Sequence, residues 1–211
     1  MARAKAQSMN ANFSQNFQYA DKHMGASIRL FAHEFHVGPE DVLIPSEKED
    51  KKECKDFKIR YQGSELVALS RIRRENGYAI AYFDMDFTIR AWPKNNLDLP
   101  MELEKIFHKS YGDVMLYALS DVNYDITRWR LLRMRSFRDT FYYDKKRHLV
   151  LSRQTGLSIG AMQSNRDEND TVFWACPLIE LPDNALYRGE KLPRKPDPAA
   201  GTFFEGLHLN A

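Results

Sequence analysis

Hydrophobic side chains near the start of the chain recur every three or four positions, the spacing of one face of a helix. Ser14 is a favourable N-cap for this segment, and Gly38-Pro39 ends it. Its apolar positions are Phe17, Ala20, Met24, Ile28, Phe31 and Phe35. The pattern predicts a long first helix that buries one side against the rest of the protein.

The spacing then changes to alternation, which is typical of strands. Strands are predicted over about 56–62, 65–74 and 78–91. Gly63-Ser64 and Asn76-Gly77 are turn signals between them, so two successive hairpins are expected. Together they form an antiparallel, three-stranded sheet.

The positions of these turns fix which residues face each other. Asp56 is then opposite Arg71, and Arg71 is also opposite Tyr82 on the third strand. Because side chains alternate along a strand, the charged positions fall on one face of the sheet. This predicted polar face consists of Asp56, Arg71, Arg73, Tyr82, Asp84, Asp86 and Arg90. A functional site is expected there.

Further elements follow along the chain. A short helix is predicted over 101–109 and a buried strand over 113–121. A strand then enters a short helix at about 136–143, and strands follow near 148–156 and 171–182. The expected fold is therefore a single α/β domain with a mixed central β-sheet. Its core has the order α-β-β-β-α-β, with C-terminal strands added.

The ends of the chain differ in composition from this domain. Residues 1–13 are polar and basic, and residues 186–211 are rich in proline and charge, so both are expected to be extended arms around a domain over 14–185. The first residues lack the apolar core of a secretory leader, and no apolar run is long enough to cross a membrane. A cytoplasmic protein is expected, in the host cytoplasm if the chain is encoded by a phage.

Overall composition permits a substantial core but does not identify a ligand. The chain has 211 residues, 43% of them hydrophobic, and 31 basic against 29 acidic residues. This near balance makes local clustering the relevant signal for nucleic-acid binding. Arginines gather on the second predicted strand and again between 128 and 138. The residues expected to contact phosphates are Arg71, Arg73, Arg74, Arg90 and Arg130; a solvated surface is the alternative interpretation.

The order helix–strand–strand–strand–helix–strand, with an acid opening the first strand and a basic residue on the second, resembles the PD-(D/E)xK nuclease superfamily. The resemblance covers about residues 14–121, and the final strand also looks like that of some phage-type members. It implies that Asp56 is the first acidic ligand of a divalent metal ion. It also implies an assisting carboxylate on the first helix, which is Glu34, with Asp21 as the alternative.

The second acidic motif of that superfamily is incomplete in this chain. The matching positions read Leu69-Ser70-Arg71 or Arg71-Ile72-Arg73, which supply a basic residue but no carboxylate. If the protein is active, we expect Asp84 to replace the missing ligand. Asp56, Asp84 and Glu34 would then hold Mg²⁺, and Lys58 or Arg73 would stabilise charge on the phosphate.

Two functions from different classes therefore follow from the sequence. The first is a nuclease-like nucleic-acid-binding protein with a degenerate or divergent metal-dependent phosphodiesterase site. The alternative is a non-enzymatic interaction module, such as a phage assembly component or an inhibitor of host defence. In the alternative, the two terminal arms dock on a protein partner.

Overall fold

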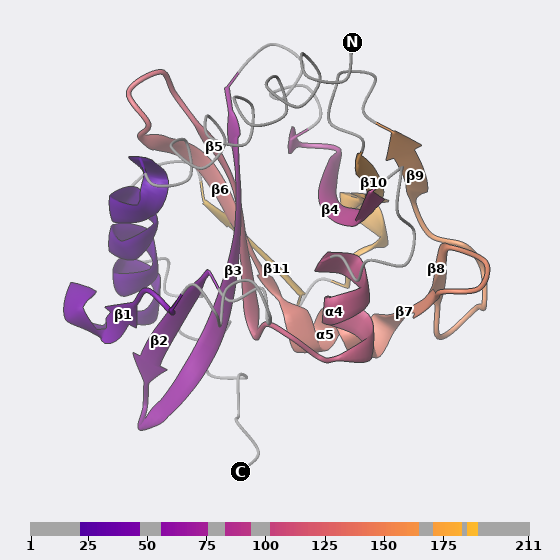
Figure 1. Ribbon diagram of the computed structural model, residues 1–211, viewed down its shortest axis with the longest axis horizontal. Coiled ribbons are helices and arrows are strands. Elements are labelled where there is room, and N and C mark those ends of the chain that lie inside the picture. The colour runs from indigo at the N-terminus through magenta and orange to yellow at the C-terminus, as the bar shows by residue number, and fades with distance from the viewer. Residues whose placement is uncertain are drawn as a thin grey trace, which may run out of the picture.

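The computed structural model of the protein describes residues 22–46, 56–75, 83–93, 102–164, 171–182 and 185–189. Its largest element is a six-stranded sheet, shown edge-on near the centre of Figure 1. In spatial order the strands are β1 (Val42–Leu43), β2 (Phe57–Tyr61), β3 (Ser64–Arg74), β5 (Val114–Ser120), β6 (Ile126–Arg133) and β11 (Leu186–Gly189).

This main sheet is mixed. The central strands β3 and β5 are parallel, and every other neighbouring pair is antiparallel. All seven residues of β5 are buried, which explains its continuous apolar sequence VMLYALS. The predicted α/β class with a mixed central sheet is confirmed.

One face of the main sheet is covered by the N-terminal helix, described over residues 22–35. Leu30, Phe31 and Phe35 are buried on its inner side, as the helical spacing predicted. They pack in one apolar cluster with sheet residues that include Phe57 and Leu66. Figure 1 shows this helix in indigo, beside β3 and above β1.

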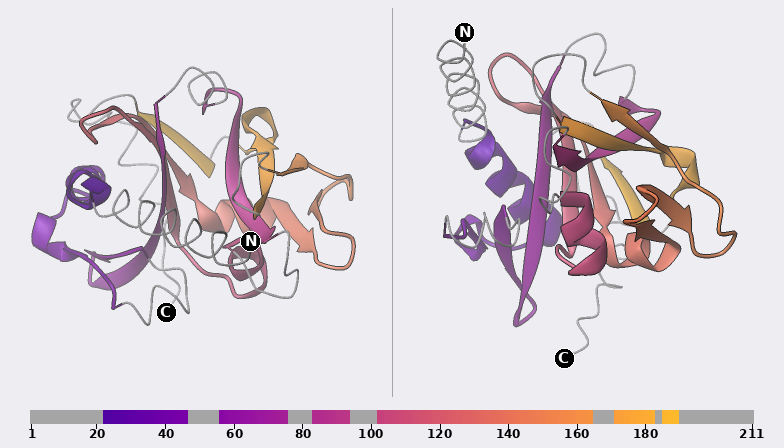
Figure 2. Two further views of the ribbon diagram at one scale, coloured as in Figure 1. Left: turned by 45° about the horizontal axis from the view of Figure 1, so that its top comes forward. Right: turned by 45° about the vertical axis from the view of Figure 1, so that its right-hand side comes forward.

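The other face packs against a second layer. It contains a three-stranded sheet of β4 (Asp86–Pro93), β10 (Thr171–Pro177) and β9 (Ala161–Ser164), and a hairpin of β7 (Phe141–Asp144) and β8 (Leu149–Ser152). The helices α4 (Glu102–His108) and α5 (Met134–Thr140) complete this layer. Short 3₁₀ turns, η1 (Pro39–Asp41) and η2 (Leu178–Glu180), precede β1 and follow β10. The right-hand view of Figure 2 shows the N-terminal helix on one side of β3, with β4 and β10 on the other.

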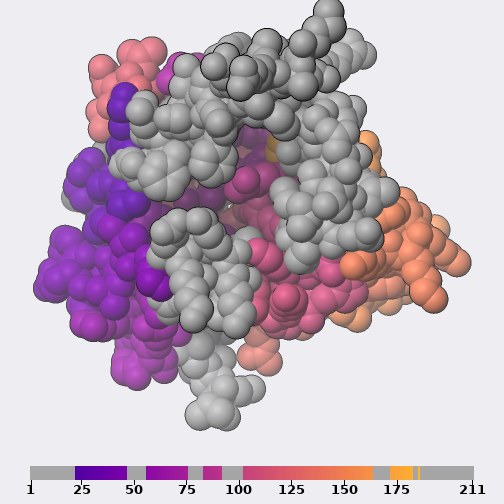
Figure 3. Space-filling model, in the orientation of Figure 1, coloured from indigo at the N-terminus to yellow at the C-terminus, as the bar shows by residue number. Residues whose placement is uncertain are grey.

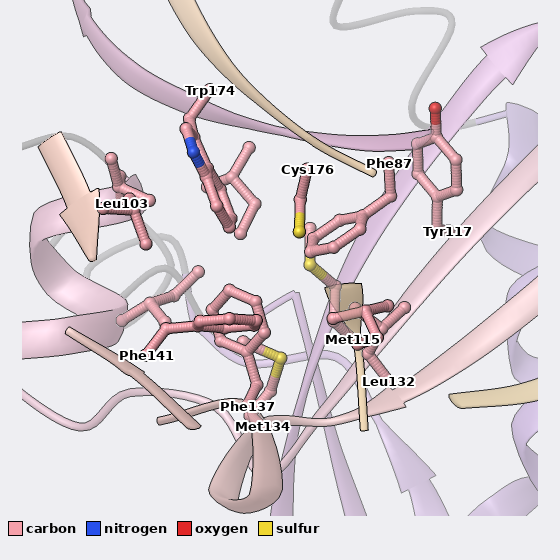
Figure 4. Packing of buried hydrophobic residues seen from close by; sticks show 14 of the residues in the cluster. Phe87, Leu103, Met115, Tyr117, Leu132, Met134, Phe137, Phe141, Trp174 and Cys176 are labelled. Carbon is pink, nitrogen blue, oxygen red and sulfur yellow. The ribbon is translucent and has the colours of Figure 1, made fainter. Parts of the chain in front are cut away.

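An aromatic core joins the second layer to the main sheet. Phe87, Phe137 and Trp174 pack edge-on or tilted, with ring centroids 5.7–5.8 Å apart. Tyr117 of β5 lies at the margin of this core, and in Figure 4 its hydroxyl points away from Phe137 and Trp174. In the space-filling view, β1–β3 and the N-terminal helix form one side of the molecule and β7–β8 the other (Figure 3).

The predicted register of the first hairpin is wrong by two residues. Arg60 pairs with Glu65, and Phe57 pairs with Ala68, so the turn is Gln62-Gly63. Both turn residues have positive φ, 48° and 78°, as the tightest hairpin turns require. A shift of two residues keeps each side chain on its predicted face, but it removes Asp56 from the position opposite Arg71.

The predicted pairing of the second and third strands is also wrong. β3 pairs with β5 along Ala68–Arg74, while β4 pairs with β10 in the second sheet. The central position beside β3 is buried on both faces, which suits the apolar β5 better than β4 with its Asp86 and Arg90. Residues 78–82 of the predicted third strand lie outside the described residues.

The ends of the chain differ in how far they are described. Leu186–Gly189, which the sequence placed at the start of the C-terminal arm, pair with β6 as strand β11. The N-terminal arm and the remainder of the C-terminal arm lie outside the described residues. No helix in the described part of the chain is both long and apolar enough to span a membrane.

Candidate functional site

Charged side chains are concentrated between the main sheet and the second layer. Arg71 on β3 is aligned with Tyr117 on β5, and Tyr117 is aligned with Arg130 on β6. Side chains in this row share a face of the sheet, which is the face toward β4 and α4. We call the following five residues the arginine layer: Arg71, Arg73, Arg90, Arg128 and Arg130.

Glu102, in the first turn of α4, connects two members of the arginine layer. Its Oε2 lies 3.8 Å from Nη1 of Arg71 and 3.4 Å from Nε of Arg90. The Arg71 guanidinium also lies 4.8 Å from the centre of the Phe173 ring. Burial lowers the pKa of Arg71 to about 10, although the charge of Glu102 opposes this shift. The Glu102 carboxylate thus interacts with both arginines, and Arg71 is the one that is strongly desolvated.

Arg73 is held by a hydroxyl instead of a carboxylate. Its Nη2 donates to Oγ1 of Thr88 at 2.6 Å, and Nε of Arg71 donates to the same oxygen at 3.2 Å. Asp86 is close enough for Arg73 to affect its titration. Burial nevertheless raises the pKa of Asp86, and its Oδ1 is buried without a hydrogen-bond donor among the described residues. A carboxyl group with an unused acceptor therefore lies beside Arg73.

Asp84 lies between two arginines of β6. Its Oδ1 is 2.6 Å from Arg128 and 2.7 Å from Arg130. The hydrogen bond from Arg128 is the main cause that lowers the pKa of Asp84. Arg130 is almost fully buried, donates to the carbonyl oxygen of Phe83 and lies over the Phe83 ring at 4.0 Å. Asp84 thus neutralises arginine charge and is not available as an isolated metal ligand.

Among the described residues, arginines outnumber carboxylates in the arginine layer. Its five arginines are accompanied there by three carboxylates, from Asp84, Asp86 and Glu102. Guanidinium groups retain several N–H donors after forming one ion pair, and they bind phosphate and carboxylate oxygens in pairs. The chemistry available here is recognition of an anionic group.

Asp56 and Lys58, two of the predicted catalytic residues, act within the β2–β3 hairpin. The Asp56 carboxylate accepts a hydrogen bond from the backbone N–H of Ser70, and the Asp56 N–H donates to the carbonyl oxygen of Ala68. Nζ of Lys58 lies 3.5 Å from Glu65 on the neighbouring strand. Both side chains thus have contacts that hold the first two long strands together.

Glu34, the third predicted ligand, lies on the other side of the main sheet. It is buried in the N-terminal helix, and its Oε1 is 2.8 Å from Nδ1 of His33. Burial raises the pKa of Glu34, with the contact to His33 opposing the shift. The sheet separates Glu34 from Asp84, because the arginines that hold Asp84 project from the opposite face. The three predicted metal ligands therefore do not converge, and the described residues contain no group of three metal-ligating side chains.

Most of the predicted phosphate-contact residues do come together. Arg71, Arg73, Arg90 and Arg130 belong to the arginine layer, but Arg74 alternates to the opposite face of β3. The layers bring them together, not the adjacent strands that the sequence predicted. Sequence reasoning missed Glu102 as the partner of Arg71. Glu102 lies on the apolar side of a short helix. This position could have indicated a buried carboxylate, which requires a basic partner.

No protein-family model matches this chain, and no curated protein matches it.

Proposed function

We propose that this protein binds nucleic acid, with four members of the arginine layer contacting phosphate groups: Arg71, Arg73, Arg90 and Arg128. The fifth member, Arg130, is buried. The observation that carries the proposal is that arginines outnumber carboxylates among the residues described in this layer, where burial has removed much of the water around Arg71. Phe173 beside Arg71 adds an aromatic surface, which in nucleic-acid-binding proteins stacks on bases. Phosphate contacts of this kind supply affinity without reading sequence.

The same geometry favours binding over metal-dependent cleavage. Hydrolysis with Mg²⁺ requires oxygen ligands close enough to share an ion. Asp56 contacts the β3 backbone, Asp84 is held by two arginines, and Glu34 lies beyond the sheet. We therefore propose a nuclease-like protein that retains nucleic-acid binding through a degenerate site.

Binding to labelled single-stranded and duplex DNA and RNA, at several salt concentrations, tests this function. Arg90→Gln is the primary variant, since the side chain of Arg90 is 56% exposed and its loss need not affect folding. We expect weaker binding and a salt slope smaller by about 0.7–0.9 for each lost phosphate contact. Arg71→Gln/Arg73→Gln should lower affinity further.

Arg60→Gln is the matched control, because Arg60 is exposed at the far end of the β2–β3 hairpin. Equal affinity of the Arg90→Gln, Arg71→Gln/Arg73→Gln and Arg60→Gln variants would contradict the role of the arginine layer. Parallel incubations with Mg²⁺ or EDTA test cleavage. Metal-dependent cutting that Asp56→Ala abolishes would overturn the non-catalytic part of the proposal.

A protein-binding role is the second candidate, and two exposed apolar side chains favour it. Met85 is 55% exposed and Ile179 is 91% exposed. Their segments are adjacent, since the N–H of Leu178 donates to the carbonyl oxygen of Met85 at 2.9 Å. If this surface binds a protein, Met85→Ser/Ile179→Ser should reduce partner retention in a pull-down while leaving nucleic-acid affinity unchanged.

A further inference from the structure

The carboxyl ends of the parallel strands β3 and β5 lie side by side. Arg74 is aligned with Ser120, and the N–H of Glu75 donates to the carbonyl oxygen of Ser120 at 2.7 Å. Ligands of open α/β sheets bind beyond the carboxyl ends of such strands. The residues at this end of the sheet are distinct from the arginine layer, because Arg73 and Arg74 point to opposite faces.

Tyr124, in the turn between β5 and β6, has an unusual backbone conformation. Its φ is 66°, a region that bulky residues rarely occupy. The Asp121 carboxylate fixes the turn by accepting hydrogen bonds from the N–H groups of Asn123 and Asp125, at 2.8 and 3.0 Å. Strained residues of this kind concentrate at functional sites.

A buried pair supports the Tyr124 ring from behind. His23 and Ser120 are both buried, and Nε2 of His23 lies 2.7 Å from Oγ of Ser120. The His23 ring meets Tyr124 edge-on, with centroids 5.3 Å apart and an interplanar angle of 77°. The turn and this contact together fix the direction of the phenol group.

Two cations converge on the Tyr124 hydroxyl. Nζ of Lys22 donates to it at 2.9 Å and lies 4.5 Å from the ring centre. Hydrogen bonds from Lys22 and, more weakly, from Arg74 lower the pKa of Tyr124. Two carboxylates are close in the described part of the chain: Glu75 accepts from Thr127, and Asp121 holds the turn. Lys22 and Arg74 thus approach the same hydroxyl.

We propose that Lys22, Arg74 and Tyr124 form a second subsite, which takes a phosphate group. Lysine supplies a point charge, arginine supplies paired donors, and the phenol hydroxyl donates to a phosphate oxygen. The phosphate comes from a small molecule or from a nucleic-acid strand, and both present the same oxygens to these three residues.

Titration with inorganic phosphate tests the subsite, with sodium chloride at matched ionic strength as the reference. Bound phosphate adds negative charge beside the phenol, so it should shift tyrosinate formation at Tyr124 to higher pH, measured by ultraviolet absorbance. The shift should be absent in Tyr124→Phe. Calorimetry should show phosphate affinity about tenfold weaker in Lys22→Gln and in Arg74→Gln, the expected loss for one charge-assisted contact.

Arg60→Gln is again the matched control, because Arg60 pairs with Glu65 at the opposite end of β3 from Arg74. It should bind phosphate as the unmodified protein does. A phosphate response no larger than that with chloride, a shift that persists in Tyr124→Phe, or an equal loss in Arg60→Gln would overturn the proposal. Circular dichroism confirms that each variant is folded.

Short oligonucleotides with and without a 5′-phosphate distinguish the two sources. Competition by both indicates a backbone phosphate, competition by the phosphorylated form alone indicates a terminal phosphate, and competition by neither indicates a small molecule. The subsite is independent of the proposed nucleic-acid function: Arg71→Gln/Arg73→Gln should keep the phosphate response. That variant separates failure of the arginine layer from failure of the subsite.

Discussion

Arg128 and Arg130 bind the same carboxylate but differ in burial. Arg130 is 3% exposed and also donates to the Phe83 carbonyl, whereas Arg128 is 26% exposed. Arg130→Ala removes the hydrogen bond to the Phe83 carbonyl oxygen and creates a cavity. We therefore expect a loss of about 2–4 kcal/mol in the free energy of unfolding. Arg128→Ala should cost at most about 1 kcal/mol. Urea denaturation measures both, and equal losses would contradict this assignment.

Asp86 and Asp84 should affect the pH dependence of stability in opposite directions. Burial raises the pKa of Asp86 above 3.8 in the folded protein, so its stabilising contribution is complete below pH 3.8 and is lost as pH rises through the folded-state pKa. Asp86→Asn should therefore become more stable than the unmodified protein as pH rises from 3.8 toward about pH 7.

The pKa of Asp84 is lowered from 3.8 instead. Its contribution is present above pH 3.8 and disappears as pH falls through the folded-state pKa. Asp84→Asn should therefore be destabilising near neutral pH and lose that effect on acidification. Urea denaturation across this pH range measures the two variants together. If the stabilities of the two variants change with pH in the same direction, burial is not the main influence on the pKa of Asp86.

At the level of elements, periodicity in the sequence identified the helices and strands but not how the strands pair. The first helix, the β2–β3 hairpin and the buried β5 were predicted because each depends on local spacing. The hairpin register was predicted wrongly because the local sequence is compatible with a turn at Gly63-Ser64 and with one at Gln62-Gly63. The Asn76-Gly77 turn signal suggested a partner for β3, but burial of β5 beside β3 outweighed it.

The Gln62-Gly63 turn can be tested by a pair of glycine substitutions. Gly63 has φ of 78° and open space around it, so Gly63→Ala adds backbone strain alone and should cost about 1–2 kcal/mol. Gly25 is helical, and an added Cβ would be at ordinary contact distance, 3.5 Å from Arg29. Gly25→Ala should stabilise the protein by about 0.5–1 kcal/mol. Thermal denaturation should show opposite signs, and a shared sign would contradict the two backbone assignments.

For the whole molecule, the site depends on packing of two layers. The sequence placed Arg71, Arg73, Asp84 and Asp86 on adjacent strands of one sheet. In the structure Asp86 lies near Arg73 across the two layers, and Asp84 contacts Arg128 and Arg130 instead. In the structure, β4 faces β3 across the core. The alternation of polar and apolar residues along a strand does not predict such a long-range contact. The predicted metal ligands lie apart for the same reason, since sequence spacing did not reveal that a sheet separates Glu34 from Asp84.

Both apolar clusters share β5, so the two layers should unfold together. Leu116 is fully buried in the cluster beneath the N-terminal helix, and Leu116→Ala should cost about 2–5 kcal/mol. Tryptophan fluorescence reports on both clusters, through Trp129 in one and Trp174 in the other. It should change together with far-ultraviolet circular dichroism. Leu157→Ala, at a 67% exposed position, is the control, and two separate transitions would contradict a shared core.

The pairing of β4 with β10 has a consequence for biosynthesis. Ile89 is aligned with Trp174, so the ribosome must make most of the chain before β4 meets its partner. Until then, Phe87 and Ile89 are unshielded on the nascent polypeptide, a situation that slows folding and invites aggregation. Chaperone dependence during translation would therefore follow from this one distant strand pair.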